Sequence, residues 1–210
     1  MKKNNYFFRD YKTKTALKKD IKDLIDSYAF NQEFESELLS DLIAEKHYYC
    51  SFYGIKPLRF IKKNNYNSYD FYGFFTTLGW HKVSWRKCIY PESKELIVKQ
   101  ALRDAIQPYS SECKRHYPIC ERCCKEPSEE TDHIDPEFDV IAKQALETLS
   151  DKDWESIMIN SFDFSIKEPF RLPENNPALI YTLEAHKTAK LQAVCKKCHN
   201  ANAKERRKKT

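Results

Sequence analysis

The sequence predicts an α+β protein with two domains, residues 1–110 and 111–210. Three observations support this prediction. Apolar residues recur at helical spacing near the N-terminus, an aromatic and partly alternating stretch that is typical of strands follows Pro57, and both CxxC pairs come after Pro108. A chain of 210 residues can bury one large core or two small ones, and its three glycines and 41% hydrophobic residues indicate that it folds.

The first domain is expected to combine helices with aromatic strands. Helices are predicted over residues 14–28 and 34–48. Strands are predicted in the segments YDFYGFFTTLGW and HKVSWRKCIY, with turns near Gly73 and Gly79. The apolar face of the first helix carries Leu17, Ile21, Leu24, Ile25 and Tyr28.

A further helix, over residues 93–106, is expected to close the first domain, because Pro108 and the serines after it favour a boundary. In the second domain a strand is predicted to end at the segment DHIDP. Helices are predicted over residues 138–149, 151–160 and 188–206.

The net charge of +5 is concentrated at the two ends of the chain. Lys187 to Thr210 holds nine Lys or Arg and one acid, and Met1 to Lys22 holds eight and two. Basic ends favour a polyanionic partner, because a Lys or Arg on a phosphate releases counterions; a solvated tail is the alternative. Without an apolar run of about 18 residues or a signal peptide, we expect a cytoplasmic protein with no membrane partner.

The cysteines predict a structural zinc site. Thiols stay reduced in the cytoplasm, so two CxxC pairs indicate metal binding rather than disulfides. Four thiolates at about 2.3 Å form a closed tetrahedral zinc site. Cys124 is an alternative to Cys123, and Cys113 is a spare; both are interpreted as packing residues. The predicted ligands are Cys120, Cys123, Cys195 and Cys198.

A closed zinc site offers no open position for a substrate, so any catalysis must come from other residues. Asp132 and His133 follow the first cysteine pair, and His199 directly follows the second. The second pair, His199 and Asn202 share one face of the expected final helix, at spacings of three, four and seven. Zinc is therefore expected to bring Asp132, His133 and His199 into one neighbourhood.

Together, the segments CERC, DHIDP and LQAVCKKCH resemble the zinc-containing HNH (ββα-metal) endonucleases, over roughly residues 113–209. The resemblance implies a zinc-stapled nuclease domain in which His133 is the general base and Asp132 and His199 hold one catalytic Mg²⁺ or Mn²⁺. The chemistry agrees, because an imidazole with a pKa of about 6.5 takes a proton from water near neutral pH. A hard cation with open positions stabilises the leaving oxygen.

The sequence departs from the family pattern at one position. Lys190 stands where the family usually has an Asn, whose implied role is to orient the base histidine. We predict that His186 takes this role; Asn160, Asn175 and Asn176 are the alternatives. The alternative interpretation is that His186 has no role in the site and lies on the surface of a helix.

The implied substrate is double-stranded DNA, cut by a restriction-type enzyme in a bacterial or phage-infected cell. One such centre cuts one strand, so a double-strand break requires a homodimer or two successive nicks. Two alternative functions remain: a zinc protein that binds nucleic acid without cutting it, and a nuclease that processes structured RNA. The residues expected to contact nucleic acid are Lys196, Lys197, Asn200, Asn202, Lys204, Arg206 and Arg207.

The first domain has a looser resemblance to the DCL-like family, in KTKTALKKDIKDLID, ELLSDLIAEKHYY, YDFYGFF and HKVSWRKCI. The resemblance implies an α+β module associated with nucleic acid, here a recognition domain. Its aromatic residues either stack on bases or fill the core, and the core is the more frequent outcome. These residues are Tyr66, Tyr69, Tyr72, Trp80 and Trp85.

Overall fold

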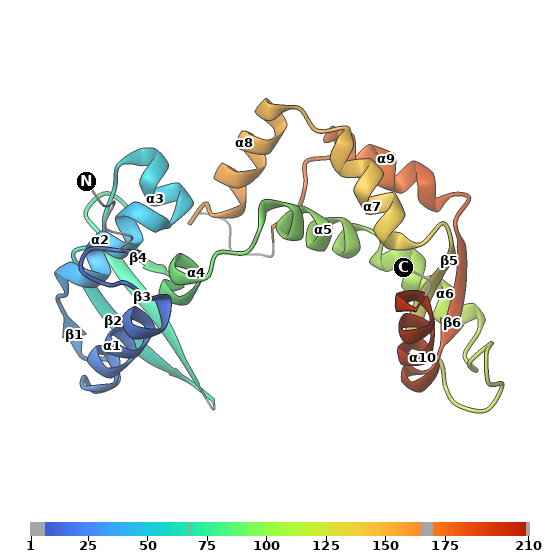
Figure 1. Cartoon of the computed structure of the whole chain (residues 1–210), viewed down its shortest axis with the longest axis horizontal. Helices are drawn as coiled ribbons and strands as arrows, with labels where there is room; N and C mark the ends of the chain where they lie inside the picture. The colour runs from blue at the N-terminus through green and yellow to red at the C-terminus, as the bar shows by residue number, and fades with distance from the viewer. Residues whose placement is uncertain (1–6, 67, 165–169, 209–210) are drawn as a thin grey trace. The chain divides into compact units, whose positions relative to one another are not determined.

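A computed structural model describes residues 7–66, 68–164 and 170–208. It confirms the mixed α+β class (Figure 1). The chain divides into two compact units, unit 1 (Met1–Ser93 and Met158–Pro169) and unit 2 (Lys94–Ile157 and Phe170–Thr210). The division after Ser93 lies earlier than the boundary expected near residue 110. The helix that begins at Lys94 packs against later helices of unit 2 and therefore belongs with them.

Unit 1 contains a four-stranded antiparallel sheet in the order β1-β2-β3-β4, with helices packed on one face. Thr13 caps the first helix by accepting a hydrogen bond from the amide of Ala16 (3.2 Å). The elements are α1 (Lys14–Asp26), β1 (Glu33–Phe34), α2 (Glu37–Lys46), α3 (Tyr48–Tyr53), β2 (Arg59–Asn65), β3 (Ser68–Phe75), β4 (Gly79–Lys82) and α4 (Trp85–Ile89).

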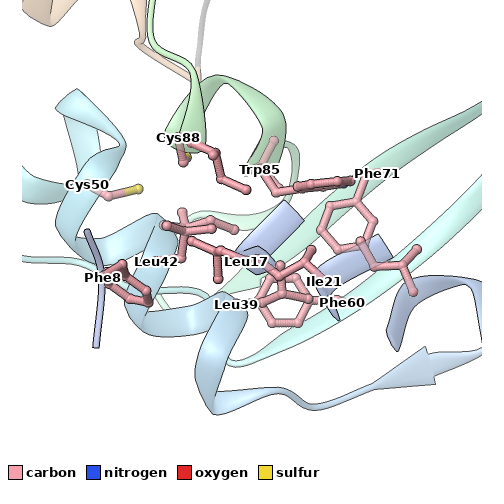
Figure 2. Packing of buried hydrophobic residues seen from close by; sticks show 14 of the residues in the cluster. Phe8, Leu17, Ile21, Leu39, Leu42, Cys50, Phe60, Phe71, Trp85 and Cys88 are labelled. Atoms are coloured by element: carbon pink, nitrogen blue, oxygen red, sulfur yellow. The ribbon is translucent and has the colours of Figure 1, made fainter. Parts of the chain in front are cut away.

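The core of unit 1 follows from two periodicities. Leu17, Ile21 and Ile25 lie on the inner face of α1 and are fully buried, as their helical spacing predicts. Alternate residues of the strands, including Phe60 and Phe71, point to the same interior, where their rings stack with centroids 5.5 Å apart (Figure 2). The helices and the sheet therefore share one apolar layer.

Three predictions for unit 1 need correction. Gly73 lies inside β3 rather than at a turn, and a Cβ there would come within 2.9 Å of Pro57, so close packing explains the glycine. Trp85 begins helix α4 and is buried, although a strand was expected. The second helix starts at Glu37 rather than residue 34, because Phe34 pairs with Phe60 in the sheet. The turn at Gly79 is confirmed by its φ of 80°.

Unit 2 is mainly helical around one two-stranded antiparallel sheet of β5 and β6. Helix α7 packs against α9, α5 packs against both, and α6 and α10 pack against the strands. The elements are α5 (Lys94–Ala105), α6 (Gln107–His116), β5 (Glu130–Asp135), α7 (Phe138–Glu147), α8 (Asp151–Ser161, of which residues up to Ile157 belong to this unit), α9 (Pro177–His186), β6 (Lys190–Val194) and α10 (Lys196–Arg207).

The expected final helix, residues 188–206, is wrong in its first part. Lys190–Val194 forms β6, because it pairs with β5 along its length and buries Ala193 and Val194. The helix begins only after Cys195, which caps it. Pro108 does not end a domain either; it lies in the first turn of α6, where its missing N–H costs no hydrogen bond. Among the described helices, none has the length and apolar character needed to cross a membrane.

Candidate functional site

Four cysteines meet where the loop after α6 contacts the start of α10. Their sulfur atoms all lie within 4.8 Å of one another, close enough to hold one metal ion. Cys124 is exposed and lies outside the cluster, as does Cys113 on α6, so Cys123 rather than Cys124 is the candidate metal ligand beside Cys120. The cluster contains the predicted residues Cys120, Cys123, Cys195 and Cys198.

The electrostatics of this cluster suit a divalent cation such as zinc. Burial disfavours the Cys120 thiolate, but backbone N–H groups, with those of Cys123 and Cys195 first, outweigh it and lower the Cys120 pKa to about 6. Desolvation and the neighbouring sulfurs raise the pKa of Cys198 to about 12. The Cys120 thiolate thus forms readily, and its negative charge disfavours ionisation of the neighbouring thiols. A cation at the centre removes that opposition, and cysteine thiolates are preferred zinc ligands.

A cavity of about 400 Å³ opens beside the cluster in unit 2. Asp132 and His133, neighbours on β5, line it together with His199 from the first turns of α10. The structure therefore brings these three predicted residues together. Three further carboxylates and three basic side chains also line the cavity, namely Glu130, Glu137, Asp139, Arg103, Lys114 and Arg206.

The carboxylate of Asp132 is buried and held from three sides. Asn202 donates to Oδ2 at 2.6 Å, and Arg206 donates to Oδ1 at 2.8 Å. Nε2 of His199 lies 3.9 Å from the same Oδ1. Arg122 hydrogen-bonds to Asn202 and forms a 2.6 Å ion pair with Glu205, which fixes this face of α10 to the CxxC loop. The buried charge of Asp132 is therefore matched by a cation and an amide.

His133 and His186 form a direct hydrogen bond between their Nε2 atoms, at 2.7 Å. Nδ1 of His186 lies 2.7 Å from the carbonyl oxygen of Thr182. A carbonyl only accepts, so Nδ1 of His186 carries a proton; in the neutral form of this ring its Nε2 then accepts from Nε2 of His133. The remaining nitrogen of neutral His133, Nδ1, is then the proton acceptor, and within the described residues no hydrogen bond occupies it.

His133 is neutral near pH 7. Burial is the main cause, followed by the neighbouring His186, and together they lower the His133 pKa to about 4, against the opposing effect of Asp132. Asn176 does not take the orienting role, because it caps α9 by accepting from two backbone amides. Lys190, at the position of the family's Asn, begins β6. His186, predicted to orient the base histidine, hydrogen-bonds to His133, and the two ring centroids lie 4.9 Å apart.

The residues predicted to contact nucleic acid divide into two groups. Asn202 and Arg206 turn inward to Asp132, and Arg206 also lines the cavity. The side chain of Arg207 lies outside the described residues. The exposed members are Lys196, Lys197, Asn200 and Lys204.

Two contributors were not predicted. Arg122 lies between two cysteines of the cluster, and the carbonyl oxygen of Thr182 fixes His186 through a hydrogen bond. Arg122 and its partner Glu205 are separated by 83 positions, and no local pattern in the sequence links them. A backbone carbonyl leaves no signal in residue identity.

In comparisons with known proteins, no family model, curated protein or solved structure matches the chain. The resemblance to the HNH family therefore rests on the quoted segments and the four-cysteine cluster, and the resemblance to the DCL-like family rests on its quoted segments alone.

Proposed function

We propose that unit 2 is a metal-dependent nuclease of the HNH kind that hydrolyses phosphodiester bonds in DNA. The observation that carries the proposal is the cavity in which Asp132, His133 and His199 come together beside a four-cysteine cluster. The cluster would hold zinc and fix the start of α10, so that His199 faces β5. A pocket that gathers a buried carboxylate and a histidine with a strongly shifted pKa is typical of catalytic sites.

His133 serves as the general base in this proposal. It is neutral near pH 7, and its hydrogen bond to His186 leaves Nδ1 to take a proton from an attacking water, while a pKa of about 4 makes it a weaker base than an ordinary histidine. His186 is a positioning residue, because it sets the tautomer and orientation of the His133 ring without reaching the substrate. The Thr182 carbonyl completes the chain that fixes both rings.

Asp132 and His199 supply an oxygen and a nitrogen donor on one side of the cavity, 3.9 Å apart, and this pair fits a small divalent cation. Bound Mg²⁺ or Mn²⁺ would stabilise the charge that develops on the scissile phosphate. Arg206 donates to the same Oδ1 of Asp132. In our proposal Arg206 turns from Asp132 to the phosphate when the ion binds.

The exposed basic groups of α10 support a nucleic-acid substrate. Lys196, Lys197 and Lys204 are exposed beside Asn200 on the helix that carries His199. Contacts to phosphates position a nuclease on its substrate without reading sequence. We propose double-stranded DNA as the substrate, in a restriction-type system, with a homodimer required for a double-strand break.

The test is plasmid cleavage with Mg²⁺ or Mn²⁺, comparing the wild-type protein with His133→Ala. His116→Ala is the matched control, because His116 lies on α6 of the same unit and is exposed. Nicked or linear products that vanish only in His133→Ala would support the proposal. No cleavage of DNA or structured RNA by a zinc-loaded, folded protein would refute it.

One observation favours a second candidate, a zinc protein that binds nucleic acid without cutting it. Asp132 is already satisfied by Asn202 and Arg206, so the cavity is stable without a catalytic ion. In that case Asp132 anchors α10 and His133 is a buried structural residue. Retained DNA binding with no turnover in either metal would identify this candidate.

A further inference from the structure

The two faces of the unit 1 sheet differ in composition. The inner face carries buried rings such as Phe60 and Phe75. The outer positions stay partly or fully accessible and are mostly aromatic or charged. The register places them in adjacent rows. They include Arg59, Ile61, Lys63, Asp70, Tyr72, Phe74, Trp80 and Lys82.

Three aromatic rings of this face are neighbours. Phe74 pairs with Trp80 across β3 and β4, and their ring centroids are 5.4 Å apart. Tyr72 lies two residues before Phe74 and therefore on the same face. The structure separates these residues from other aromatics of the segment, since Trp85 is 2% exposed and Tyr69 packs against the core. Tyr72, Phe74 and Trp80 form what we call the outer aromatic row.

Cations lie over the faces of these rings. The Arg59 guanidinium is 4.6 Å from the Phe74 centroid, and the Lys63 ammonium is 4.9 Å from that of Tyr72. The two rings therefore lie on the outer side of the sheet, each in contact with a cation of strand β2 rather than with the apolar core. Cation–π contacts of this kind hold arginine and lysine where a flat base and its phosphate would be received together.

The charges of the face are positive but partly compensated. Arg59 pairs with Glu33 at 2.7 Å, and Lys82 pairs with Asp70 at 2.5 Å. Lys63 has no ion-pair partner in the described part of the chain. The face therefore carries one uncompensated cation beside the aromatic row, so stacking rather than charge must dominate its recognition.

A fourth aromatic residue stands at the end of the β2–β3 hairpin. Tyr66 is 98% exposed and follows the exposed residues Lys63, Asn64 and Asn65. A tyrosine so exposed gains nothing from burial in the chain itself. It extends the accessible aromatic surface toward the hairpin tip.

We infer that the outer aromatic row of unit 1 binds unpaired bases of a single-stranded nucleic acid. A flat sheet face with rings accepts the π-face of a base, and base faces are free only where the strand is unstacked and unpaired. Duplex DNA hides these faces, so the site is distinct from the duplex cleft proposed for unit 2. Arg59 and Lys63 would contact the phosphates between stacked bases.

The test uses the full-length protein and a fluorescein-labelled oligothymidine, followed by anisotropy without added Mg²⁺ or Mn²⁺. Each ring lost from the row, in Tyr72→Ala or Trp80→Ala, should weaken binding roughly tenfold, because base–aromatic stacking is worth on the order of 1–3 kcal/mol per base. Trp80→Phe should restore most of the affinity. Tyr53→Ala is the matched control, because Tyr53 is 52% exposed on α3 of the same unit.

Near-UV circular dichroism and the thermal midpoint separate lost stacking from lost folding. Folded variants that bind as tightly as wild type would overturn the inference, and so would equal losses for the single strand and for a duplex of the same sequence. Absence of oligothymidine and oligouridine binding by folded wild-type protein would also overturn it. His133→Ala should bind oligothymidine normally, so failure of the nuclease proposal and failure of this inference give different results.

Discussion

Unit 1 and the β5–β6–α10 part of unit 2 are held together by different means. In unit 1, sixteen described hydrophobic residues form one buried cluster between the helices and the sheet. Around the cysteines of unit 2 the buried cluster contains only Val194 besides Cys120 and Cys195 among the described residues. Apolar burial can stabilise the first region without a ligand, whereas the second has too little apolar surface beside its strands to do so. The comparison predicts opposite responses to metal removal and to core mutation.

Metal removal should have the largest effect, and only in unit 2. A structural zinc site contributes on the order of 10 kcal/mol in small zinc-binding peptides, so chelation should unfold β5, β6 and α10. Hydrogen exchange of these segments measures the effect directly. Cys195→Ser should mimic chelation, because Cys195 is a buried member of the cluster.

Cys124→Ser is the control for this experiment, because Cys124 is exposed and lies outside the cluster. It should leave zinc content and exchange unchanged. Full protection of β5 and β6 in zinc-free protein would contradict the comparison, since helices α6 and α10 would then suffice to hold the strands.

A core mutation should act only in unit 1, and by less. Phe60 lies on β2 and is fully buried, and its ring stacks on Phe71. Phe60→Ala should lower the free energy of unfolding of unit 1 by about 3–5 kcal/mol, through lost transfer energy and a cavity. Urea unfolding followed by tryptophan fluorescence measures it, with zinc stoichiometry as the readout for unit 2. Loss of zinc in this variant would show that the two units unfold together.

The contrast between the regions also explains what the sequence predicted about the fold. Helix α1 was predicted because Leu17, Ile21 and Ile25 bury one face, and such periodicity is visible in the sequence. Strand β6 was missed because Leu191 to Val194 fits a helical pattern equally well, and its pairing with β5 is a contact between distant segments. This segment is therefore a strand because it pairs with β5, not because of its local propensity.

The residues of the candidate site likewise divide into those that the sequence predicts and those that depend on contacts between distant segments. The four cysteines were predicted because metal geometry requires a fixed spacing of ligands. His186 was a prediction from a missing family residue, and its contact with His133 depends on where α9 ends. The inward turn of Arg206 was not predicted, because a terminal run of basic residues gives no sign that one of them faces a buried aspartate.

Acid should destabilise unit 1 through His47. Burial lowers the His47 pKa from 6.5 to about 4, and its ring stacks on Phe164 with no hydrogen bond to Nδ1 among the described residues. Between pH 6.5 and 4 the unfolded chain binds a proton that the folded unit does not, so stability falls as the pH falls. The loss should approach about 3 kcal/mol, since one pKa unit corresponds to about 1.4 kcal/mol.

His47→Phe should remove this pH dependence, because it keeps an aromatic ring against Phe164 and cannot take a proton. Urea unfolding at pH 7 and pH 4.5 measures the change. His116→Gln is the control, because His116 is exposed on α6. An unchanged pH dependence in His47→Phe would assign the acid sensitivity to another group.

The smallest effect on stability should come from mutation of the helix caps. The cap variants of the two units should nevertheless differ in DNA cleavage. Asn176 accepts from the amides of Ala178 (3.0 Å) and Leu179 (3.3 Å) and so begins α9, which ends at His186. Asn176→Ala should cost unit 2 about 1 kcal/mol. Thr13→Ala removes the matching cap of α1 and should cost unit 1 a similar amount.

The two cap variants should differ in cleavage, because only α9 carries a residue that positions His133. Asn176→Ala should slow plasmid nicking several-fold at a temperature where unit 2 stays folded, and Asn176→Asp should restore it. Thr13→Ala should nick at the wild-type rate. Equal nicking by all three variants would mean that His186 keeps its place without the cap, held by its hydrogen bonds to Thr182 and His133. Slower nicking in Thr13→Ala would instead mean that unit 1 contributes to cleavage, which nothing in the geometry of the cavity requires.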